Sequence, residues 1–267
     1  MKQDLHIHTI YSDGELNEYE IIEEVLKSDV EEFSICDHDT IMGSEKVYNL
    51  LLKDNYKLIF HSGIELSCRY ENVNMHLLVR DFKYDDKNMI YLIEKISKLR
   101  DERIKYMVEY VNDIYKVNIK EKAIDEILKC TDSFGKPHLY KILLTYGDYD
   151  RKEYYSKMDN LNVDRFKLDT KEVFELLKYS GCNITLAHPI EIIREYKLTY
   201  QDIDSLICEL SKIGLYGVET RHSNQTNSDY LKFSKMAQKY GLVETCGSDF
   251  HGEGVKPGIK IGMIEKR

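Results

Sequence analysis

The sequence predicts an α/β fold, in which a parallel sheet is surrounded by helices. Short apolar segments alternate with stretches whose apolar residues recur at helical spacing. Histidine and acidic residues directly follow several of the apolar segments, as expected where chemistry gathers at the carboxyl ends of parallel strands. A chain of 267 residues with 42% hydrophobic residues can form one large domain, or one domain carrying an insertion.

The expected strands are short and are bounded by turn-forming residues. They are Phe33–Cys36, Leu58–Phe60, Met75–Val79, Ile184–Ala187, Tyr216–Glu219 and Leu242–Cys246. Between several of them lie stretches with the periodicity of amphipathic helices. The expected helices are Glu18–Lys27, Lys171–Tyr179, Tyr200–Ile213 and Ser228–Tyr240.

The middle of the chain breaks this alternation. Across residues 99–165 the apolar residues recur at helical spacing, and the segment reads as one helix after another. We therefore predict a barrel-like domain made of residues 1–98 and 166–267, with a helical insertion domain made of residues 99–165.

The composition excludes several classes of protein. With 47 acidic and 38 basic residues, the net charge of -9 argues against a protein that coats long nucleic acid. No apolar run approaches the roughly 20 residues needed to span a bilayer, and no signal-peptide pattern opens the sequence. The six cysteines form no C-x-x-C pair and are expected to be reduced thiols. We expect a cytoplasmic protein with no membrane partner, and the sequence does not indicate its oligomeric state.

The histidines predict a metal site. His6 and His8 form an H-x-H pair whose side chains point to the same side of a strand, so both imidazoles can meet one ion. This pair alone is weak evidence, but further imidazoles and carboxylates stand beside apolar segments. Burying so many ionisable groups without metal would be costly. The candidate ligands are His6, His8, Asp13, His38, Glu65, His76, His188, Asp249 and His251.

Successive motifs of the chain resemble those of the polymerase-and-histidinol-phosphatase (PHP) family of phosphoesterases. They are DLHIHTIYSDGE, SICDHDT, GIELS, HLLV, LAHP and GSDFHG. The resemblance covers nearly the whole chain and is greatest to the branch of 5′→3′ exoribonucleases and 3′,5′-nucleoside bisphosphate phosphatases. It implies a distorted (β/α)7 barrel with a small helical domain inserted between the HLLV and LAHP motifs.

The resemblance also implies how the candidate ligands divide among about three divalent ions. One ion would be surrounded by His6, His8, Glu65 and Asp249. A second, shared by Glu65, would be held by His76 and His188, and a third by Asp13, His38 and His251. Mixed nitrogen and oxygen ligands suit Mn, Fe or Zn without selecting among them. Such ions would neutralise a phosphate ester and provide a nucleophile near neutral pH.

Catalysis is assigned to Glu65, Asp249 and His222. The last, in GVETRHSNQT, corresponds to a family histidine near the reacting phosphate and is predicted to protonate the leaving oxygen, although a polar loop residue is the alternative. In GKPHLYKILL, Lys136 and His138 occupy a segment that resembles a phosphate-binding segment of the family. Lys136 replaces an arginine there and cannot form a bidentate contact. With Arg221, these residues are expected to bind substrate through a second positively charged surface.

We predict a metal-dependent phosphoric ester hydrolase whose substrates are 3′,5′-nucleoside bisphosphates or short 5′-phosphorylated oligonucleotides. The enzymatic alternative is a histidinol-phosphate phosphatase, which the helical insertion and the KPHLYKILL segment disfavour. The alternative from another class is a non-catalytic metal-binding or scaffold domain. Such domains usually lack some of the ligands, and this chain lacks none of the candidates.

Overall fold

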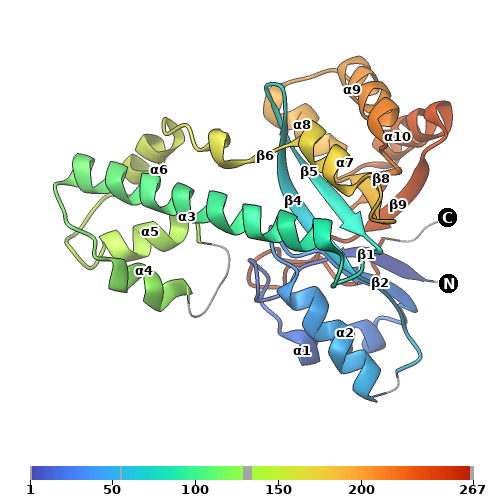
Figure 1. The fold of residues 1–267 in the computed structure, drawn as a ribbon, viewed down its shortest axis with the longest axis horizontal. Helices are drawn as coiled ribbons and strands as arrows, with labels where there is room; N and C mark the ends of the chain where they lie inside the picture. Colours follow the sequence, from blue (N-terminus) through green and yellow to red (C-terminus); the bar gives the residue numbers. More distant parts are fainter. Residues whose placement is uncertain (1, 55, 129–133, 265–267) are drawn as a thin grey trace. The chain divides into compact units, whose positions relative to one another are not determined.

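The computed structural model describes residues 2–54, 56–128 and 134–264 (Figure 1). The chain divides into two compact units. Met1–Ile93 and Leu168–Arg267 form the first, which we call the barrel unit, and Glu94–Lys167 form the second, the helical unit. Each unit is described in its own frame.

The barrel unit contains two sets of hydrogen-bonded strands. One is a parallel sheet of three strands in the order β1-β2-β3, and the other has six strands in the order β6-β4-β5-β7-β8-β9. The three-stranded sheet consists of β1 (Gln3–Ile7), β2 (Glu32–Ile35) and β3 (Ile59–His61). The six-stranded sheet consists of β4 (Gly63–Tyr70), β5 (Val73–Arg80), β6 (Leu168–Asp169), β7 (Asn183–Leu186), β8 (Gly217–His222) and β9 (Val243–Gly247).

Two isolated bridges join the sheets. Ile7 pairs with Phe250 just beyond the end of β9, and His38, just beyond the end of β2, pairs with Glu65 of β4. The strands thereby close a distorted barrel in the order β1, β2, β4, β5, β7, β8, β9. The predicted fold class, a distorted α/β barrel, is confirmed.

The prediction of a wholly parallel sheet is wrong at β5, which runs antiparallel to β4 and to β7. Only Glu71 and Asn72 separate β4 from β5, and so short a turn can join antiparallel strands but not parallel ones. As a result, Glu65 lies inside a β-ladder rather than at its end. His76 also lies inside it, opposite Ser67.

Helices of the barrel unit follow the predicted periodicity closely. Two of them, α9 and α10, begin with a capping box and end at a left-handed glycine, which are the signals that fix helix bounds in a sequence. The predicted helices appear as α1 (Glu18–Lys27), α7 (Thr170–Leu177), α9 (Tyr200–Ile213) and α10 (Asn227–Tyr240). Two others, which were not predicted, are α2 (Met42–Asp54) and α8 (Pro189–Tyr196).

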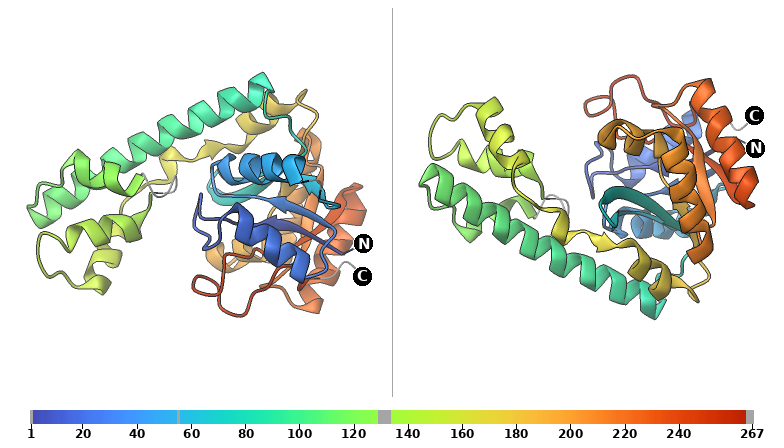
Figure 2. Two further views of the ribbon diagram at one scale, coloured as in Figure 1. Left: turned by 90° about the horizontal axis from the view of Figure 1, so that it is seen from below. Right: turned by 90° about the horizontal axis from the view of Figure 1, so that it is seen from above.

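Helices α1 and α2 lie side by side in Figure 1 and in the left view of Figure 2, where they are drawn in shades of blue. Together with β1 and β2 they enclose one apolar core, to which Ile21, Val25, Phe33 and Val47 each contribute a fully buried side chain. This core anchors the strands whose ends carry His6, His8 and His38, so that packing holds the carboxyl ends of β1 and β2 in place.

The helical unit is built around α3 (Lys87–Tyr115), which begins before the predicted boundary at residue 99 because no glycine or proline interrupts it. Its other elements are α4 (Glu121–Leu128), α5 (Lys136–Leu143), α6 (Arg151–Asp159) and a short 3₁₀ turn at Asp164–Phe166. Their apolar faces meet in one core around Met107, Leu139 and Tyr154.

No helix within the described ranges has the length and apolar content needed to cross a membrane. Of the cysteines, Cys36, Cys68 and Cys246 are buried, Cys182 and Cys208 are partly buried, and none of these five forms a disulfide. Cys130 lies outside the described residues.

Candidate metal centre

The predicted ligands come together at one end of the barrel. Each lies on a strand of the barrel or in the loop that follows one. His6, Glu65 and His76 project from β1, β4 and β5, while the others lie in the loops after β1, β2, β7 and β9. Those loop residues are His8, Asp13, His38, His188, Asp249 and His251.

The first ligand group surrounds one oxygen of Glu65, which is fully buried. The Nε2 atoms of His6 and His8 lie 3.1 Å from each other, and each lies 3.1 Å from Glu65 Oε2. Asp249 Oδ1 lies 3.2 Å from His8 Nε2 and 3.7 Å from His6 Nε2. Ligands that bind zinc tetrahedrally at about 2.1 Å are roughly 3.4 Å apart. These four atoms therefore have the spacing of a metal coordination shell.

A second group forms around the other oxygen of the same carboxylate. Glu65 Oε1 lies 2.8 Å from His188 Nε2 and 3.0 Å from His76 Nδ1. His38 Nδ1 lies 3.2 Å from Glu65 Oε2, which is the oxygen of the first group. His38, Glu65 and His76 are nevertheless close enough together to be ligands of one ion. Glu65 thus has imidazoles at both oxygens, as a bridging carboxylate would.

A third group forms around Asp13. Its carboxylate lies 3.3 Å from His251 Nε2, 3.8 Å from His38 Nε2 and 3.6 Å from His8 Nδ1. Asp13 is about half exposed, whereas His8 and His251 are buried. All nine predicted ligands therefore lie in a continuous cluster, with His8 and His38 each touching two groups.

The ring nitrogens provide a test of whether cations fit this cluster. The Nδ1 atoms of His38, His76 and His188 are buried and have no hydrogen-bond partner, although each lies within ion-pair distance of a carboxylate. Buried polar atoms are nearly always hydrogen-bonded. Ring nitrogens that lie near carboxylates but form no hydrogen bond with them are typical of ligands arranged around metal ions. The residues present therefore fit divalent metal ions.

Electrostatics also favour positive charge at this centre. Burial would raise the pKa values of Glu65 and Asp249, but the surrounding histidines hold both well below their usual range. Burial would lower the pKa of His8, but hydrogen bonds to Asp249 and Glu65 raise it to about 9. The carboxylates therefore keep their negative charge, which metal ions or protons balance.

Glu219 supports the ligands, although it was not among the predicted site residues. This fully buried carboxylate, on β8, lies 3.1 Å from His6 Nδ1 through Oε1 and accepts a hydrogen bond from His188 N at 2.8 Å through Oε2. It can thus orient the imidazole of His6 and fix the loop that carries His188. The available signal was an acidic residue inside the apolar segment YGVET, at a position expected to be buried.

Asp37 stabilises the loop after β1. It accepts hydrogen bonds from Thr9 N, Thr9 Oγ1 and Ser12 Oγ, each at 2.7 Å, and so holds the loop that carries Asp13. A Cβ at Gly43 would lie 2.0 Å from Asp37 Oδ2, so the start of α2 needs glycine for this close approach.

The backbone is strained where two of the ligands are attached. His188 has a φ of 24° and Asp249 a φ of 57°, a region that non-glycine residues rarely adopt. Before Asp249, a Cβ at Gly247 would lie only 2.3 Å from the Cβ of His6. The glycine of the GSDFHG motif therefore lets β9 approach β1 closely enough for both ligands to meet.

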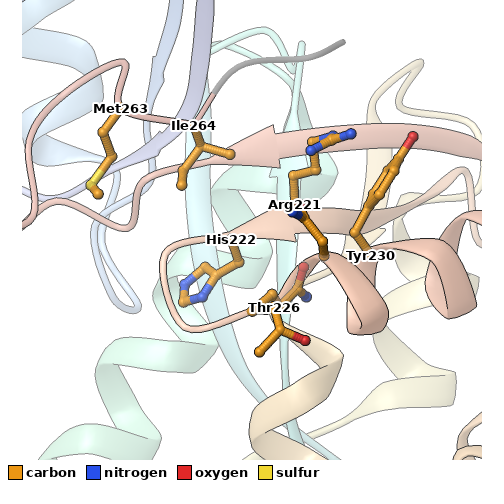
Figure 3. A pocket seen from close by; sticks show the side chains of 8 residues that line it. Arg221, His222, Thr226, Tyr230, Met263 and Ile264 are labelled. Carbon is orange, nitrogen blue, oxygen red and sulfur yellow. The ribbon is translucent and has the colours of Figure 1, made fainter.

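His222 borders the cluster. Its Nε2 lies 3.1 Å from Asp249 Oδ2, and its Nδ1 accepts a hydrogen bond from Asn224 N at 3.1 Å. The neighbouring Arg221 projects in a different direction from β8 (Figure 3). Its guanidinium lies over the ring of Tyr230, 3.4 Å from the ring centre. Both basic residues line a pocket of about 350 Å³, together with Gln225, Thr226 and Tyr230.

Lys136 and His138 lie in the helical unit, in the first turn of α5. The Lys136 ammonium donates to Asp159 Oδ1 at 2.7 Å. His138 Nδ1 accepts a hydrogen bond from Gly135 N at 3.0 Å, and burial lowers the pKa of this imidazole. Both side chains thus have local partners, and substrate binding by them stays a prediction.

Three relatives are similar along nearly the whole chain. A 5′-3′ exoribonuclease of Haemophilus influenzae is 26% identical over 256 residues, covering 94% of this chain and 90% of the relative. A phosphoribosyl 1,2-cyclic phosphate 1,2-diphosphodiesterase of Eggerthella lenta is 25% identical over 264 residues, covering 95% of each. A 3′,5′-nucleoside bisphosphate phosphatase of Chromobacterium violaceum is 21% identical over 270 residues, covering 98% and 91%.

The fold is shared with a solved structure from Bifidobacterium adolescentis, described as that of a metal-dependent phosphoesterase. It superposes with a TM-score of 0.75 at 23% identity and covers 99% of this chain and 92% of that one. Residues 4–218 match the family described as PHP domain. That match spans most of the chain and includes seven of the nine clustered ligands. The chain therefore belongs to the PHP domain family and, given these relatives and the ligand cluster, is a metal-dependent phosphoesterase.

Proposed function

We propose that this phosphoesterase hydrolyses phosphate esters of nucleotides, either 3′,5′-nucleoside bisphosphates or short 5′-phosphorylated oligonucleotides. The observation that carries the proposal is the buried Glu65, each of whose two oxygens lies beside imidazole nitrogens. The substrate class is supported by two of the relatives, which are named as an exoribonuclease and as a nucleoside bisphosphate phosphatase.

We propose about three divalent ions per chain, of Mn, Fe or Zn. The groups around Glu65 Oε2, Glu65 Oε1 and Asp13 would hold them. When bound, such ions neutralise phosphoryl oxygens and lower the pKa of water to about 7. The protein itself keeps the carboxylates charged and, through Glu219, fixes the orientation of His6.

His222 is proposed as the proton donor to the leaving oxygen. Because its Nδ1 accepts from Asn224 N, the proton of the neutral ring is on Nε2. That atom lies beside Asp249, at the border of the ligand cluster, from where it can donate to the leaving oxygen. The pocket that His222 and Arg221 both line can accept the part of the substrate beyond the reacting phosphate.

A hydrolysis screen with Mn²⁺ tests the substrate class. The substrates are a nucleoside 3′,5′-bisphosphate, a 5′-phosphorylated oligoribonucleotide, phosphoribosyl 1,2-cyclic phosphate and histidinol phosphate. We expect kcat/KM for the bisphosphate to exceed that for histidinol phosphate by at least about tenfold, or roughly 1.4 kcal/mol. Lys136→Ala should reduce this preference more than it slows a generic aryl phosphate. A higher kcat/KM for histidinol phosphate or for the cyclic phosphate would contradict the proposed substrate.

A further inference from the structure

The two carboxylate oxygens of Asp249 face different partners. Oδ1 lies 3.2 Å from His8 Nε2 and 3.4 Å from His251 Nδ1, on the side of the candidate metal ligands. Oδ2 lies 3.1 Å from His222 Nε2 and also forms an ion pair with the ammonium of Lys256. Lys256 therefore adds a positive charge to this centre without taking the oxygen that faces the ligand histidines.

The loop that carries Lys256 is held by its own contacts. Lys256 N donates to Gly252 O at 2.9 Å, and Gly254 N donates to Glu15 Oε2 at 2.9 Å. Gly252 has a φ of 99°, and a Cβ there would lie 2.5 Å from the Cβ of Glu15. This turn therefore requires glycine, and its backbone directs the lysine side chain toward Asp249.

Lys256 remains accessible to a ligand, whereas its partner does not. Its side chain is 34% exposed, and that of Asp249 is 4% exposed. An anion that approaches Asp249 from solvent therefore meets the ammonium before the carboxylate. An ammonium has three N–H donors, and the ion pair with Asp249 Oδ2 leaves donors for a second acceptor.

We propose that Lys256 is a phosphate-binding residue of the active centre, where it donates to an oxygen of the reacting phosphate next to His222. A phosphate dianion must approach a cluster that contains the buried carboxylates of Glu65, Asp249 and Glu219. A lysine presented at the exposed edge of that cluster offsets the repulsion and suits phosphate as a point charge. The proposal depends on the phosphoesterase activity and not on the nucleotide specificity proposed above.

Binding of inorganic phosphate to the Mn²⁺-loaded protein tests the proposal. Lys256→Met, Lys256→Gln and Lys256→Arg are compared with Lys260→Met, which changes an exposed lysine of the same segment. Calorimetry measures phosphate affinity, and elemental analysis measures bound metal. We expect phosphate affinity to fall about tenfold or more in the methionine and glutamine variants. Arginine should restore most of it, and Lys260→Met should have no effect. Metal content should be that of the unaltered protein in all variants.

Kinetics with p-nitrophenyl phosphate separate this test from the nucleotide proposal, because that substrate carries no nucleotide. Lys256→Met should raise KM and lower kcat/KM by a factor similar to the loss of phosphate affinity. Unchanged phosphate affinity in both neutral variants would overturn the proposal. Loss of metal in parallel with phosphate would also overturn it, because Lys256 would then support the metal ligands rather than bind phosphate.

Discussion

The two units of the chain differ in whether they bury polar side chains as well as apolar ones. Within the described residues, every buried polar or charged residue lies in the barrel unit. The helical unit instead buries apolar residues and Tyr154 around one core. Apolar burial stabilises a fold directly, whereas a buried carboxylate such as Glu65 costs folding energy unless positive charge balances it. The difference in buried polar side chains indicates that the barrel interior holds the reactive groups. The helical unit is stabilised by apolar packing.

The largest expected effect is on the rate. Asp249→Asn retains the shape of the side chain but removes a negative charge beside His8 and His222. We expect kcat to fall by roughly three orders of magnitude, because preorganised charge provides much of the stabilisation of a transition state. His38→Ala should cause a similar loss. Steady-state kinetics measure the rate, and circular dichroism should show that both variants remain folded.

Asp204→Asn is the matched control for this prediction, because Asp204 pairs with Lys239 away from the ligand cluster. Its rate should equal that of the unaltered protein. Near-normal turnover in Asp249→Asn would contradict the catalytic assignment of that residue.

The next effect is on stability and belongs to the helical unit. Leu139 is fully buried in the core of that unit. Leu139→Ala should lower the free energy of unfolding by about 2–5 kcal/mol, because it leaves a cavity. Hydrogen exchange should place the loss in the helices of this unit, while elemental analysis finds unchanged metal content. Leu144→Ala, at a 43% exposed position, should have little effect. Release of metal by Leu139→Ala would contradict the inference that packing in the helical unit is independent of the metal centre in the barrel unit.

Metal removal should destabilise mainly the barrel unit. A single ion present at 100 times its Kd contributes about 2.7 kcal/mol to the folded state. After chelation, amide protection in β1 and β9 should fall, while protection around Met107 in α3 stays unchanged. Protein purified without chelator should hold about three ions per chain. Less than one bound ion after metal supplementation would contradict the metal assignment, and equal loss of protection in both units would contradict the comparison.

The smallest expected effect concerns a charged group of the barrel unit that is not a candidate ligand. His61 Nδ1 lies 2.5 Å from Asp81 Oδ1, and Nε2 lies 2.9 Å from Glu32 Oε1. The Asp81 hydrogen bond, opposed by burial, raises the pKa of His61. Protonated His61 therefore stabilises the fold fully below about pH 6.5, its unfolded pKa, and this contribution is lost as pH rises through the folded pKa.

The difference in unfolding free energy between the unaltered protein and His61→Gln should therefore be largest near pH 6 and shrink at higher pH. We expect about 1 kcal/mol or less, because these groups are partly exposed to solvent. Urea unfolding across this pH range measures it. A difference that grows with pH would contradict the assigned direction.

Local signals were sufficient to predict most of the helices. The bounds of α1 and α9 match the prediction residue for residue, because a capping box at Asn17 and another at Thr199 are written in neighbouring residues. The direction of β5 was not predicted, because strand direction depends on the length of a connection and on which strands become neighbours. The proposed cytoplasmic location and the substrate-binding roles of Lys136 and His138 stay predictions.

The fold class and the types of side chain in the candidate metal centre could be predicted from the sequence alone. Strand-end histidines and carboxylates can be recognised along the chain because they follow apolar segments, as His38 and His188 do. Only the tertiary structure decided which groups surround them. Glu219 contacts His6, which is 213 positions away in the sequence. Lys256 contacts Asp249 across a turn that contains glycine. No local sequence pattern encodes either contact. Their roles depend on strand neighbours and loop closure, which packing of the whole barrel establishes.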